Sequence, residues 1–327
     1  MPKRLLLLAL VILLGGCGGG RESERPDEPA TLLLDFTPNA VHAGIYVATD
    51  RGFDSAEGVQ LEIRKPGASA DALKLLQSGA ADMAILDIHD LGLAREKGRD
   101  LVGVMAFVQS PLAAVLAQPG IRTPRDLEGE RAGVSGLPSD VAVLRSVVRG
   151  AGGDPARVKQ VTIGFQAVKA LLAKRVAAAT AFWNVEGVAL KAQRPGMREF
   201  RVDDYGAPSY PELVLTVTRK TLDEKPEVVK ATIRALQRGY SEVQDDPESA
   251  VSTMTEREPD LDRAALSVQL DAVAPEFTAG ADEFGQLRPS VLRAWAAWDL
   301  KFGILHQPLD VRHAFDTTLV EKPQRND

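Results

Sequence analysis

The sequence predicts an α/β protein built as two lobes, and three observations support this prediction. The chain has 327 residues, which exceeds the usual size of one globular core. From residue 31 onward, strand-like apolar segments alternate with helical segments, the pattern of α/β proteins with parallel sheets. The character of the sequence changes at Pro119, and a strand-like segment at 210–217 returns the chain to the first half. The second lobe is therefore expected to be inserted in the first.

The elements of the first half end at prolines, glycines or capping residues. Pro38 ends the first strand because it fixes its own φ and biases Thr37 away from the helical region. Asn39 then suits the N-cap of the next helix. A later helix is capped by Ser69 and closes at Gly79. The predicted strands are 31–36, 59–64, 81–86, 101–107 and 113–117, and the predicted helices are 41–50, 69–78 and 91–97.

The inserted part opens with a loop and a short helix, and it carries the same alternation. Its predicted strands are 131–134, 158–162, 178–182 and 200–202, and its helices are 124–127, 141–149, 167–173 and 187–193. The returning strand 210–217 is followed by helices at 226–243, around 261–273 and around 289–302. The predicted lobes are 31–115 with 213–320, and 116–212. Ligands of open α/β sheets bind beyond the carboxyl ends of strands, so the site is expected between the lobes.

The N-terminus has the layout of a secretory signal. Lys3 and Arg4 precede an apolar run, 5–14, that is too short to span a bilayer, and small residues follow it. Leu14-Gly15-Gly16-Cys17 resembles a bacterial lipobox, in which the cysteine becomes the lipidated first residue of the mature chain. Residues 1–17 are therefore expected to be a lipoprotein signal peptide, with lipidation at Cys17. A plain signal peptide with a chance cysteine is the alternative.

Composition and charge exclude several classes of protein. Hydrophobic residues make up 45% and charged residues 26%, which is ordinary for a soluble protein. The net charge is -6 and the basic residues are interspersed with acidic ones, which argues against nucleic-acid binding. Cys17 is the only cysteine, so the mature chain has neither disulfides nor thiolate metal sites. Residues 18–30 are glycine-rich, then charged and proline-bearing, and are expected to form a disordered tether.

Four strand ends carry candidate binding groups, and the first of them is the richest. The junction between the first strand and the next helix carries five such groups within about three helical turns: Asp35, Phe36, Asn39, His42 and Tyr46. His42 and Tyr46 lie four residues apart, on one face of the predicted helix. Alternatively, these residues have only structural roles: Asn39 caps the helix, and His42 packs in the core.

The second and third strand ends offer acidic and hydroxyl groups. Asp87 follows a buried strand in "AILDIHDLG", where Asp87 or Asp90 is equally suited to cap the next helix. Ser135 and Gly136 end the strand in "GVSGLPSD", before a helix whose free N–H groups can face an anion or a polar ligand. The glycine spacing there matches neither a Walker loop nor a dinucleotide fingerprint.

The fourth strand end, "TAFWNVEGVAL", places Trp183, Asn184 and Glu186 between a buried strand and a helix. The tryptophan has a simple alternative role in the core. A carboxylate there needs a partner or a wet cleft, because burying it alone costs several kcal/mol or raises its pKa. A ligand amine is one such partner.

These segments resemble the solute-binding proteins of the pyrimidine thiamin-precursor importers. "DFTPNAVHAGIYVA" at 35–48 matches their opening, with Phe36 where tryptophan is usual. The resemblance runs from about Leu32 to the helix at 228–240. Its other matching segments are 52–53, 58–59, 79–82, 109–111, 126–129 and 183–187. The opening and the Trp-Asn-x-Glu-Gly segment are fairly specific, whereas the rest is shared with nitrate, sulfonate and taurine binders.

The resemblance implies a type 2 periplasmic-binding-protein fold, with two α/β lobes and a ligand cleft between them. It also implies ABC-importer permease and ATPase partners and a formylaminopyrimidine or hydroxymethylpyrimidine ligand. Phe36 and an aromatic such as Tyr46 or Tyr210 would sandwich the ring, and Glu186 would bond its exocyclic amine and a ring nitrogen. The other expected ligand-binding residues are Asp35, Asn39, His42, Asp87, Gln109, Ser135, Gly136, Trp183 and Asn184.

An enzyme is the main alternative class, because the same fold family includes eukaryotic pyrimidine synthases. Those relatives use a cysteine-rich iron-binding segment, and neither an HExxH nor a Gly-x-Ser-x-Gly motif occurs here. The sequence thus predicts a monomeric, membrane-anchored extracytoplasmic binder without catalytic residues, metal or cofactor. The runner-up ligands are riboflavin or another aromatic heterocycle, and a nitrate- or sulfonate-type anion, which would not favour Glu186 in its cleft.

Overall fold

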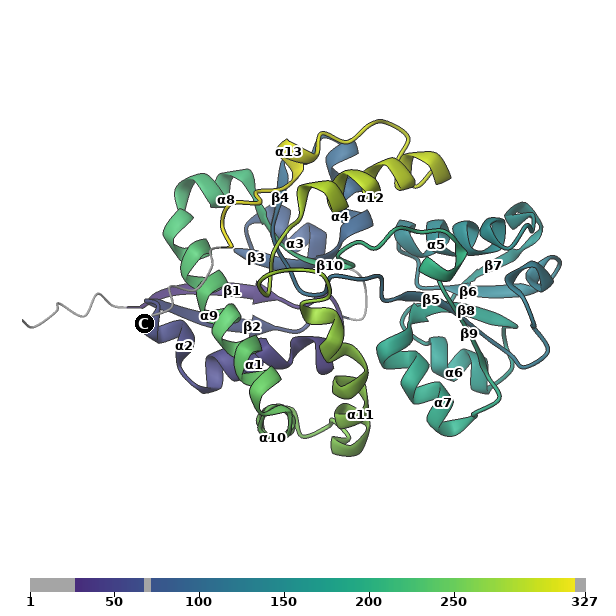
Figure 1. The fold of residues 1–327 in the computed structure, drawn as a ribbon, viewed down its shortest axis with the longest axis horizontal. Helices are drawn as coiled ribbons and strands as arrows, with labels where there is room; N and C mark the ends of the chain where they lie inside the picture. The colour runs from purple at the N-terminus through teal and green to yellow at the C-terminus, as the bar shows by residue number, and fades with distance from the viewer. Residues whose placement is uncertain (1–26, 68–71, 321–327) are drawn as a thin grey trace, which may run out of the picture.

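Two five-stranded sheets organise residues 27–67 and 72–320, which the computed structural model describes (Figure 1). The order in the first sheet is β2 (Val59–Arg64), β1 (Glu28–Leu33), β3 (Met83–Asp87), β10 (Leu213–Thr218) and β4 (Leu101–Ala106). The order in the second sheet is β7 (Lys159–Thr162), β6 (Arg131–Val134), β8 (Ala178–Phe182), β5 (Ala113–Ala117) and β9 (Arg198–Arg201). The two sheets therefore have the same layout.

One strand in each sheet runs antiparallel to its neighbours and comes from the other half of the chain. β5 pairs antiparallel with β8 and β9, and β10 pairs antiparallel with β3 and β4. The chain changes sheet between Ala106 and Ala113, and it returns to the first sheet at Leu213. The predicted boundary between the lobes, after residue 115, falls inside β5. The other lobe limits stay predictions.

Helices cover both faces of each sheet. α5 lies on one face of the second sheet, with α6 and α7 on the other (Figure 1). The α-helices are α1 (Ala43–Asp50), α2 (Phe53–Ala56), α3 (Ala72–Ser78), α4 (Ile88–Glu96), α5 (Pro138–Gly150), α6 (Ala167–Leu172), α7 (Val188–Gln193), α8 (Arg219–Glu224), α9 (Pro226–Asp245), α10 (Pro247–Arg257), α11 (Arg263–Val273), α12 (Pro289–Phe302) and α13 (Val311–Ala314). The tighter turns include η1 (Ala40–His42), and η4 (Trp183–Gly187) is a π-helix. Within the described ranges, no helix is both long and apolar enough to span a bilayer.

The first sheet is buried between two helical layers because its strands carry apolar residues on both faces. Leu32 and Ile85 pack into the cluster that contains α1 and α9, whereas Leu33 and Leu86 pack into the one that contains α4 and α12. The crossing of α1 and α9 depends on glycine. A Cβ at Gly239 would lie 2.1 Å from a backbone oxygen of α1, so any other residue would push these helices apart.

The beginning of the first strand differs from the sequence prediction. Strand 31–36 was expected after a tether at 18–30, but β1 begins at Glu28 and ends at Leu33. Residues 28–30 pair with β2 from Val59 onward, and Ala30 is buried, so these residues belong to the sheet. The rest of the predicted tether, the lipidation site Cys17 and the helix cap Ser69 lie outside the described residues.

A buried ion pair fixes α12 against the first sheet. His89 on α4 and Asp299 on α12 have no exposed surface, and Nδ1 of the histidine lies 2.8 Å from Oδ2 of the aspartate. Nε2 lies 3.0 Å from the Tyr210 hydroxyl. Burial opposes protonation of the imidazole, but Asp299, Asp87 and Glu212 outweigh it and raise the pKa of His89 to about 10. The imidazole is therefore a cation at neutral pH.

Substitution His89→Gln should lower the free energy of unfolding at neutral pH by about 3–5 kcal/mol, because the Asp299 carboxylate loses its buried cation. The matched control is His313→Gln. His313 also lies 2.8 Å from a carboxylate, that of Asp310, but both side chains are exposed, so urea unfolding should change little.

The stability contributed by His89 has a defined pH window. Its pKa is raised from 6.5 to about 10 in the folded protein, so the contribution is complete below about pH 6.5 and is lost as the pH rises toward 10. Equal urea midpoints for His89→Gln and His313→Gln at neutral pH would contradict the assignment of His89 and Asp299 as a buried ion pair.

Candidate functional site

A cavity of about 460 Å³ lies between the lobes, at the carboxyl ends of parallel strands from both sheets. Residues that follow β1, β3, β6, β7 and β8 line it. Ala113 and Leu213, the first residues of the two strands that exchange between halves of the chain, line it as well. Its volume is in the range of small-molecule sites, and its position is the one expected for open α/β sheets.

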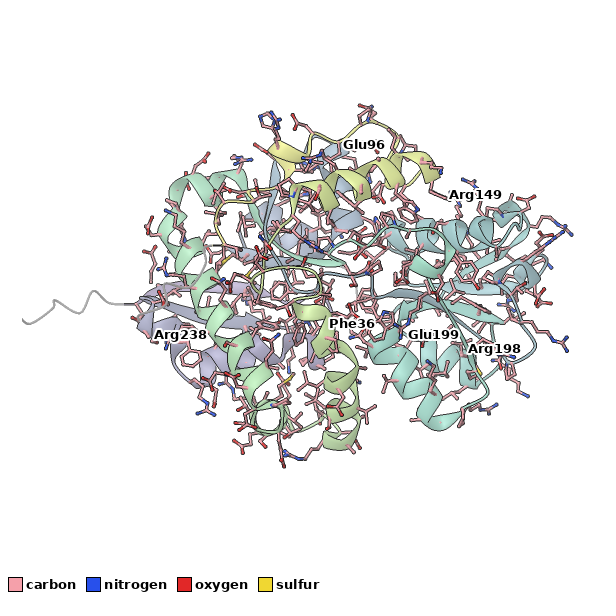
Figure 2. The ribbon with its side chains drawn as sticks, viewed as in Figure 1. Phe36, Glu96, Arg149, Arg198, Glu199 and Arg238 are labelled. Atoms are coloured by element: carbon pink, nitrogen blue, oxygen red, sulfur yellow. The ribbon has the colours of Figure 1, made fainter. Side chains whose placement is uncertain are left out.

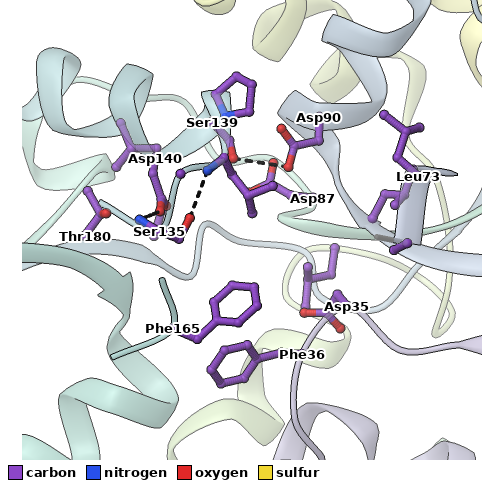
Figure 3. Close-up of a pocket in the computed structure, with 18 of the residues that line it drawn as sticks. Asp35, Phe36, Leu73, Asp87, Asp90, Ser135, Ser139, Asp140, Phe165 and Thr180 are labelled. Atoms are coloured by element: carbon purple, nitrogen blue, oxygen red, sulfur yellow. Dashed lines mark hydrogen bonds between the residues drawn. The ribbon is translucent and has the colours of Figure 1, made fainter. Parts of the chain in front are cut away.

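Two phenylalanines from opposite lobes meet at one end of this cavity. Phe36 follows β1 and lies where the first lobe meets the second (Figure 2). Phe165 follows β7, and the two ring centroids are 5.0 Å apart with the planes at 88° (Figure 3). Gly164 precedes Phe165 with a φ of +56°, a left-handed conformation that glycine adopts without strain. The pair forms an edge-to-face aromatic wall.

The segment after β1 is fixed by hydrogen bonds among its own polar side chains. Asn39 accepts a bond from the Val41 amide at 3.0 Å and so caps η1. The backbone N–H of Asn39 donates to Nδ1 of His42 at 3.2 Å, so Nδ1 is the acceptor and the imidazole proton is on Nε2. Nε2 lies 2.9 Å from Oδ1 of Asp35, which accepts this hydrogen bond. Asp35 lines the cavity, whereas Asn39 and His42 lie buried behind it and hold it in place.

Carboxylates from both lobes lie at the other end of the cavity (Figure 3). Asp90 on α4 accepts a hydrogen bond from the Ser139 hydroxyl, across the cleft, at 3.2 Å. Asp140, in the first turn of α5, accepts the Ser135 amide at 2.7 Å. Burial and the nearby Asp140 charge raise the pKa of Asp90 to about 6, and burial raises that of Asp140.

The π-helix η4 presents Glu186 to the cavity. Oε2 of the glutamate accepts the Phe182 amide at 3.2 Å. Burial raises the pKa of Glu186 to about 7, with Asp140 and Asp35 adding to the effect, so the carboxyl exchanges its proton near neutral pH. Trp183, at the start of the same turn, donates from Nε1 to the Pro111 carbonyl at 3.0 Å. The tryptophan therefore anchors η4 to the segment that joins the lobes.

Asp87, His89 and Glu212 bring possible metal-ligand atoms within 4.8 Å of one another, and no other such group was found in the described ranges. The aspartate lines the cavity and caps α4, accepting the His89 amide at 2.8 Å. Both ring nitrogens of the histidine already lie within hydrogen-bonding distance of Asp299 and Tyr210. The cluster is therefore better described as a buried ionic network than as an open metal site.

The sequence-predicted binding residues divide into two sets. Those that line the cavity are Asp35, Phe36, Asp87, Ser135, Gly136 and Glu186. Those that do not line it are Asn39, His42, Tyr46, Gln109, Trp183, Asn184 and Tyr210. The role of every one of them in binding stays a prediction.

Tyr46 and Tyr210, either of which was expected to face Phe36 across a ligand ring, do not line the cavity. The Tyr46 hydroxyl donates to Glu258 on α10 at 2.8 Å, and Tyr210 is buried against His89. Helix packing thus turns both tyrosines away from the cavity, and Phe165 occupies the position opposite Phe36.

Gln109 and Asn184 are buried outside the cavity. Gln109 donates from Nε2 to the Gln286 carbonyl at 2.9 Å, and its backbone N–H donates to the backbone carbonyl of Glu276 at 2.7 Å. Asn184 is fully buried in η4, and neither atom of its side-chain amide has a hydrogen-bond partner within the described part of the chain.

Sequence reasoning missed several residues that line the cavity, namely Asp90, Ser139, Asp140, Phe165 and Thr180. Two signals were available. From the sequence, Asp90 is interpreted only as a possible helix cap, and Ser139 and Asp140 belong to the segment "GVSGLPSD" that leads into the next helix. Phe165 stands three residues after a predicted strand, in the same relation as Phe36 to β1, and the strand-end rule applies to it equally.

Comparisons with known proteins agree with this architecture. The family model described as NMT1/THI5 like matches residues 39–250. A formylaminopyrimidine-binding protein of Halalkalibacterium halodurans is 33% identical over 256 residues, 77% of this chain and 78% of that protein. A 4-amino-5-hydroxymethyl-2-methylpyrimidine phosphate synthase of Legionella pneumophila is 28% identical over 241 residues, 71% of this chain and 74% of that protein.

A solved structure shows the same fold. The alkanesulfonate-binding protein SsuA of Xanthomonas axonopodis pv. citri, bound to MOPS, superposes with a TM-score of 0.70 at 17% identity, covering 88% of this chain and 99% of that chain. The predicted periplasmic-binding-protein fold, with two α/β lobes, is therefore confirmed.

Proposed function

The chain belongs to the NMT1/THI5-like family, and from this premise we propose that it is the extracytoplasmic solute-binding protein of an ABC importer for an aminopyrimidine precursor of thiamin. The ligand would be of the formylaminopyrimidine or hydroxymethylpyrimidine type, and a permease and an ATPase would complete the importer. The observation that carries the proposal is the combination of Glu186 with the Phe36–Phe165 wall in one cavity between the lobes.

Glu186 is suited to the amidine edge of a 4-aminopyrimidine. That edge offers an N–H donor on the exocyclic amine beside a ring nitrogen acceptor. A protonated carboxyl offers a carbonyl acceptor beside an O–H donor, and the pKa of about 7 keeps this form populated at neutral pH. An ionised Glu186 with a pyrimidinium ring makes the same two bonds, so the pair shares one proton in either case. Such bonds contribute about 1.5–3 kcal/mol.

The aromatic wall would hold the face or edge of the heterocycle. Phe36 and Phe165 already meet edge to face, and a planar ligand adds a third ring to the group. Offset or edge-on contacts of this kind contribute about 0.5–1.5 kcal/mol beyond the burial of apolar surface. Because the two rings come from different lobes, the ligand contacts both lobes at once.

The charge of the cavity supports a heterocycle over a nitrate- or sulfonate-type anion. Five carboxyl groups line it: Asp35, Asp87, Asp90, Asp140 and Glu186. The basic residues that line it, Lys97 and Arg99, are exposed. A binder is also favoured over a pyrimidine synthase, because the cysteine-rich segment implied for those enzymes has no counterpart in a chain with one cysteine.

An aminopyrimidine such as 4-amino-5-hydroxymethyl-2-methylpyrimidine should bind the purified protein with an affinity that falls above about pH 7. Once Glu186 and the pyrimidine ring are both deprotonated, the proton that they share is lost, and the affinity for the ligand drops about tenfold per pH unit. Glu186→Gln keeps a donor beside an acceptor and should remove this fall, whereas Glu186→Ala should weaken binding about 10- to 100-fold. Calorimetric titration from about pH 6 to about pH 9 measures both effects.

The control for these titrations is Glu227→Gln, the same change at an exposed position on α9, which should behave as wild type. If the affinity stays constant up to about pH 9, Glu186 and the ligand do not share a proton, and this part of the proposal is wrong. Binding of riboflavin or of an alkanesulfonate, with no aminopyrimidine bound, would show that the proposed ligand class is wrong.

Phe165→Ala should weaken the same ligand by about 1–3 kcal/mol, because one side of the aromatic wall is lost. Phe165→Leu keeps apolar volume without the ring, and its affinity should lie between those of wild type and the alanine variant. Competition binding at about pH 6.5 compares the three proteins. If all three bind equally well, the ring does not contact the ligand.

We also propose that the protein is anchored by lipid at Cys17, through the lipobox-like segment 14–17. Cys17→Ser should release the chain from the membrane fraction, because the acyl chains that hold it there are attached to the thiol. Fractionation of cells that express each form, followed by immunoblotting, provides the measurement. A serine variant that still sediments with membranes would favour another mode of attachment.

A further inference from the structure

The π-helix that carries Glu186 is fixed at its first residue, Trp183. The backbone amide of Trp183 donates to the Leu112 carbonyl at 3.0 Å, and its indole Nε1 donates to the Pro111 carbonyl at 3.0 Å. Both acceptors belong to the segment that joins the lobes, between β4 and β5. Because Glu186 is three residues further along the same turn, the position of the indole helps to set the position of the carboxyl group.

Arg201 lies over the indole of Trp183. Its guanidinium carbon is 3.9 Å from the centre of the ring, within the range of a cation–π contact. The tryptophan is buried, whereas the arginine side chain is 38% exposed. The arginine therefore contacts the ring that anchors η4 without being part of the buried core.

Glu199 holds Arg201 in this place and also contacts the other end of η4. Its Oε1 accepts a hydrogen bond from Nε of Arg201 at 2.9 Å, and its Oε2 lies 2.8 Å from Nζ of Lys191 on α7. A Cβ added at Gly187, the last residue of η4, would lie 2.9 Å from the same Oε2. The carboxylate therefore lies close against the backbone where η4 ends.

Both side chains come from one face of β9, because residues 199 and 201 are two apart in a strand. β9 is the edge strand next to β5 in the second sheet, and Figure 2 shows Glu199 in that lobe. Neither residue lines the cavity. Arg201 and Glu199 thus contact the first and last residues of η4 from outside the cavity, and Glu186 lies between these two contacts.

We propose that Arg201, held by Glu199, is a positioning residue for Glu186, because it fixes the π-helix through Trp183 and so sets how the carboxyl group meets the ligand. This inference rests on the proposed function, since it concerns the two bonds between Glu186 and the amidine edge. Hydrogen bonds weaken steeply as their angle departs from linear. A small rotation of η4 therefore weakens both bonds and leaves the fold intact.

The test is a double-mutant cycle between Arg201 and Glu186, with 4-amino-5-hydroxymethyl-2-methylpyrimidine as the probe and calorimetric titration at about pH 6.5. Arg201→Gln should weaken binding about 3- to 10-fold in the otherwise wild-type chain, because the cation–π contact is lost. In the Glu186→Ala background the same change should alter the affinity less than about twofold, because no carboxyl group remains to be misplaced. Glu199→Gln should show the same dependence on the background.

The pH profile provides a second readout, which a purely structural role would not change. Arg201→Gln should reduce the total fall in affinity between about pH 6 and about pH 9, because less of the binding then passes through Glu186. The matched control is Arg198→Gln, an exposed arginine of the same strand whose side chain points to the opposite face. It should bind as wild type in both backgrounds.

Three results would count against this role of Arg201. Wild-type affinity of Arg201→Gln overturns it and leaves the proposed function intact. Equal weakening by Arg201→Gln with and without the Glu186 carboxyl group also overturns it, because the arginine then acts on the fold or on another contact. Failure of wild type to bind the probe overturns the proposed function together with the positioning role.

Discussion

The buried carboxylate of Glu212 holds together the two chain segments that join the lobes, and the geometry of the cleft depends on this contact. One carboxylate oxygen accepts hydrogen bonds from the backbone amides of Leu112 and Ala113 at 2.7 and 2.9 Å. The backbone carbonyl of Glu212 accepts the Ile88 amide at 2.9 Å. Ala113 and Leu213 begin strands in opposite sheets, so the carboxylate joins the sheets at the base of the cavity. The carboxyl group is buried, and this burial raises its pKa, whereas the nearby His89 and the two amides that donate to it lower the pKa in part.

The same fold rule that creates the cavity also concentrates acids in it. Parallel strands end at a common edge, and acids that follow β1, β3 and β8 are thereby brought together inside a low-dielectric space. Burial in this space, together with the neighbouring carboxyl groups, raises the pKa values of Asp90 and Glu186 to about 6 and about 7. On the proposed function, a ligand that supplies N–H donors would stabilise the ionised carboxyl groups.

The sequence predicted elements well where apolar segments are bounded by clear stop signals, as for β5 and α12, whose bounds the structure reproduces. The sequence prediction failed where tertiary contacts determine whether an element forms or where it begins. β1 begins at Glu28 because β2 pairs with it, and α10 was not predicted although Asp246 caps it. The strand-end rule found one side of the cleft, Phe36, but not Phe165. Which face of a helix meets which neighbour is a property of packing, which local sequence does not encode.

Each recognition element of the cleft is divided between the lobes. Phe36 and Phe165 form the aromatic wall from opposite sides, and Asp90 and Asp140 form the acidic end in the same way. On the proposed function, a ligand held by one lobe alone would contact half of each wall, so opening of the lobes would weaken all of its contacts together. The residues that line the cavity come from segments far apart in the sequence, and no single motif contains them.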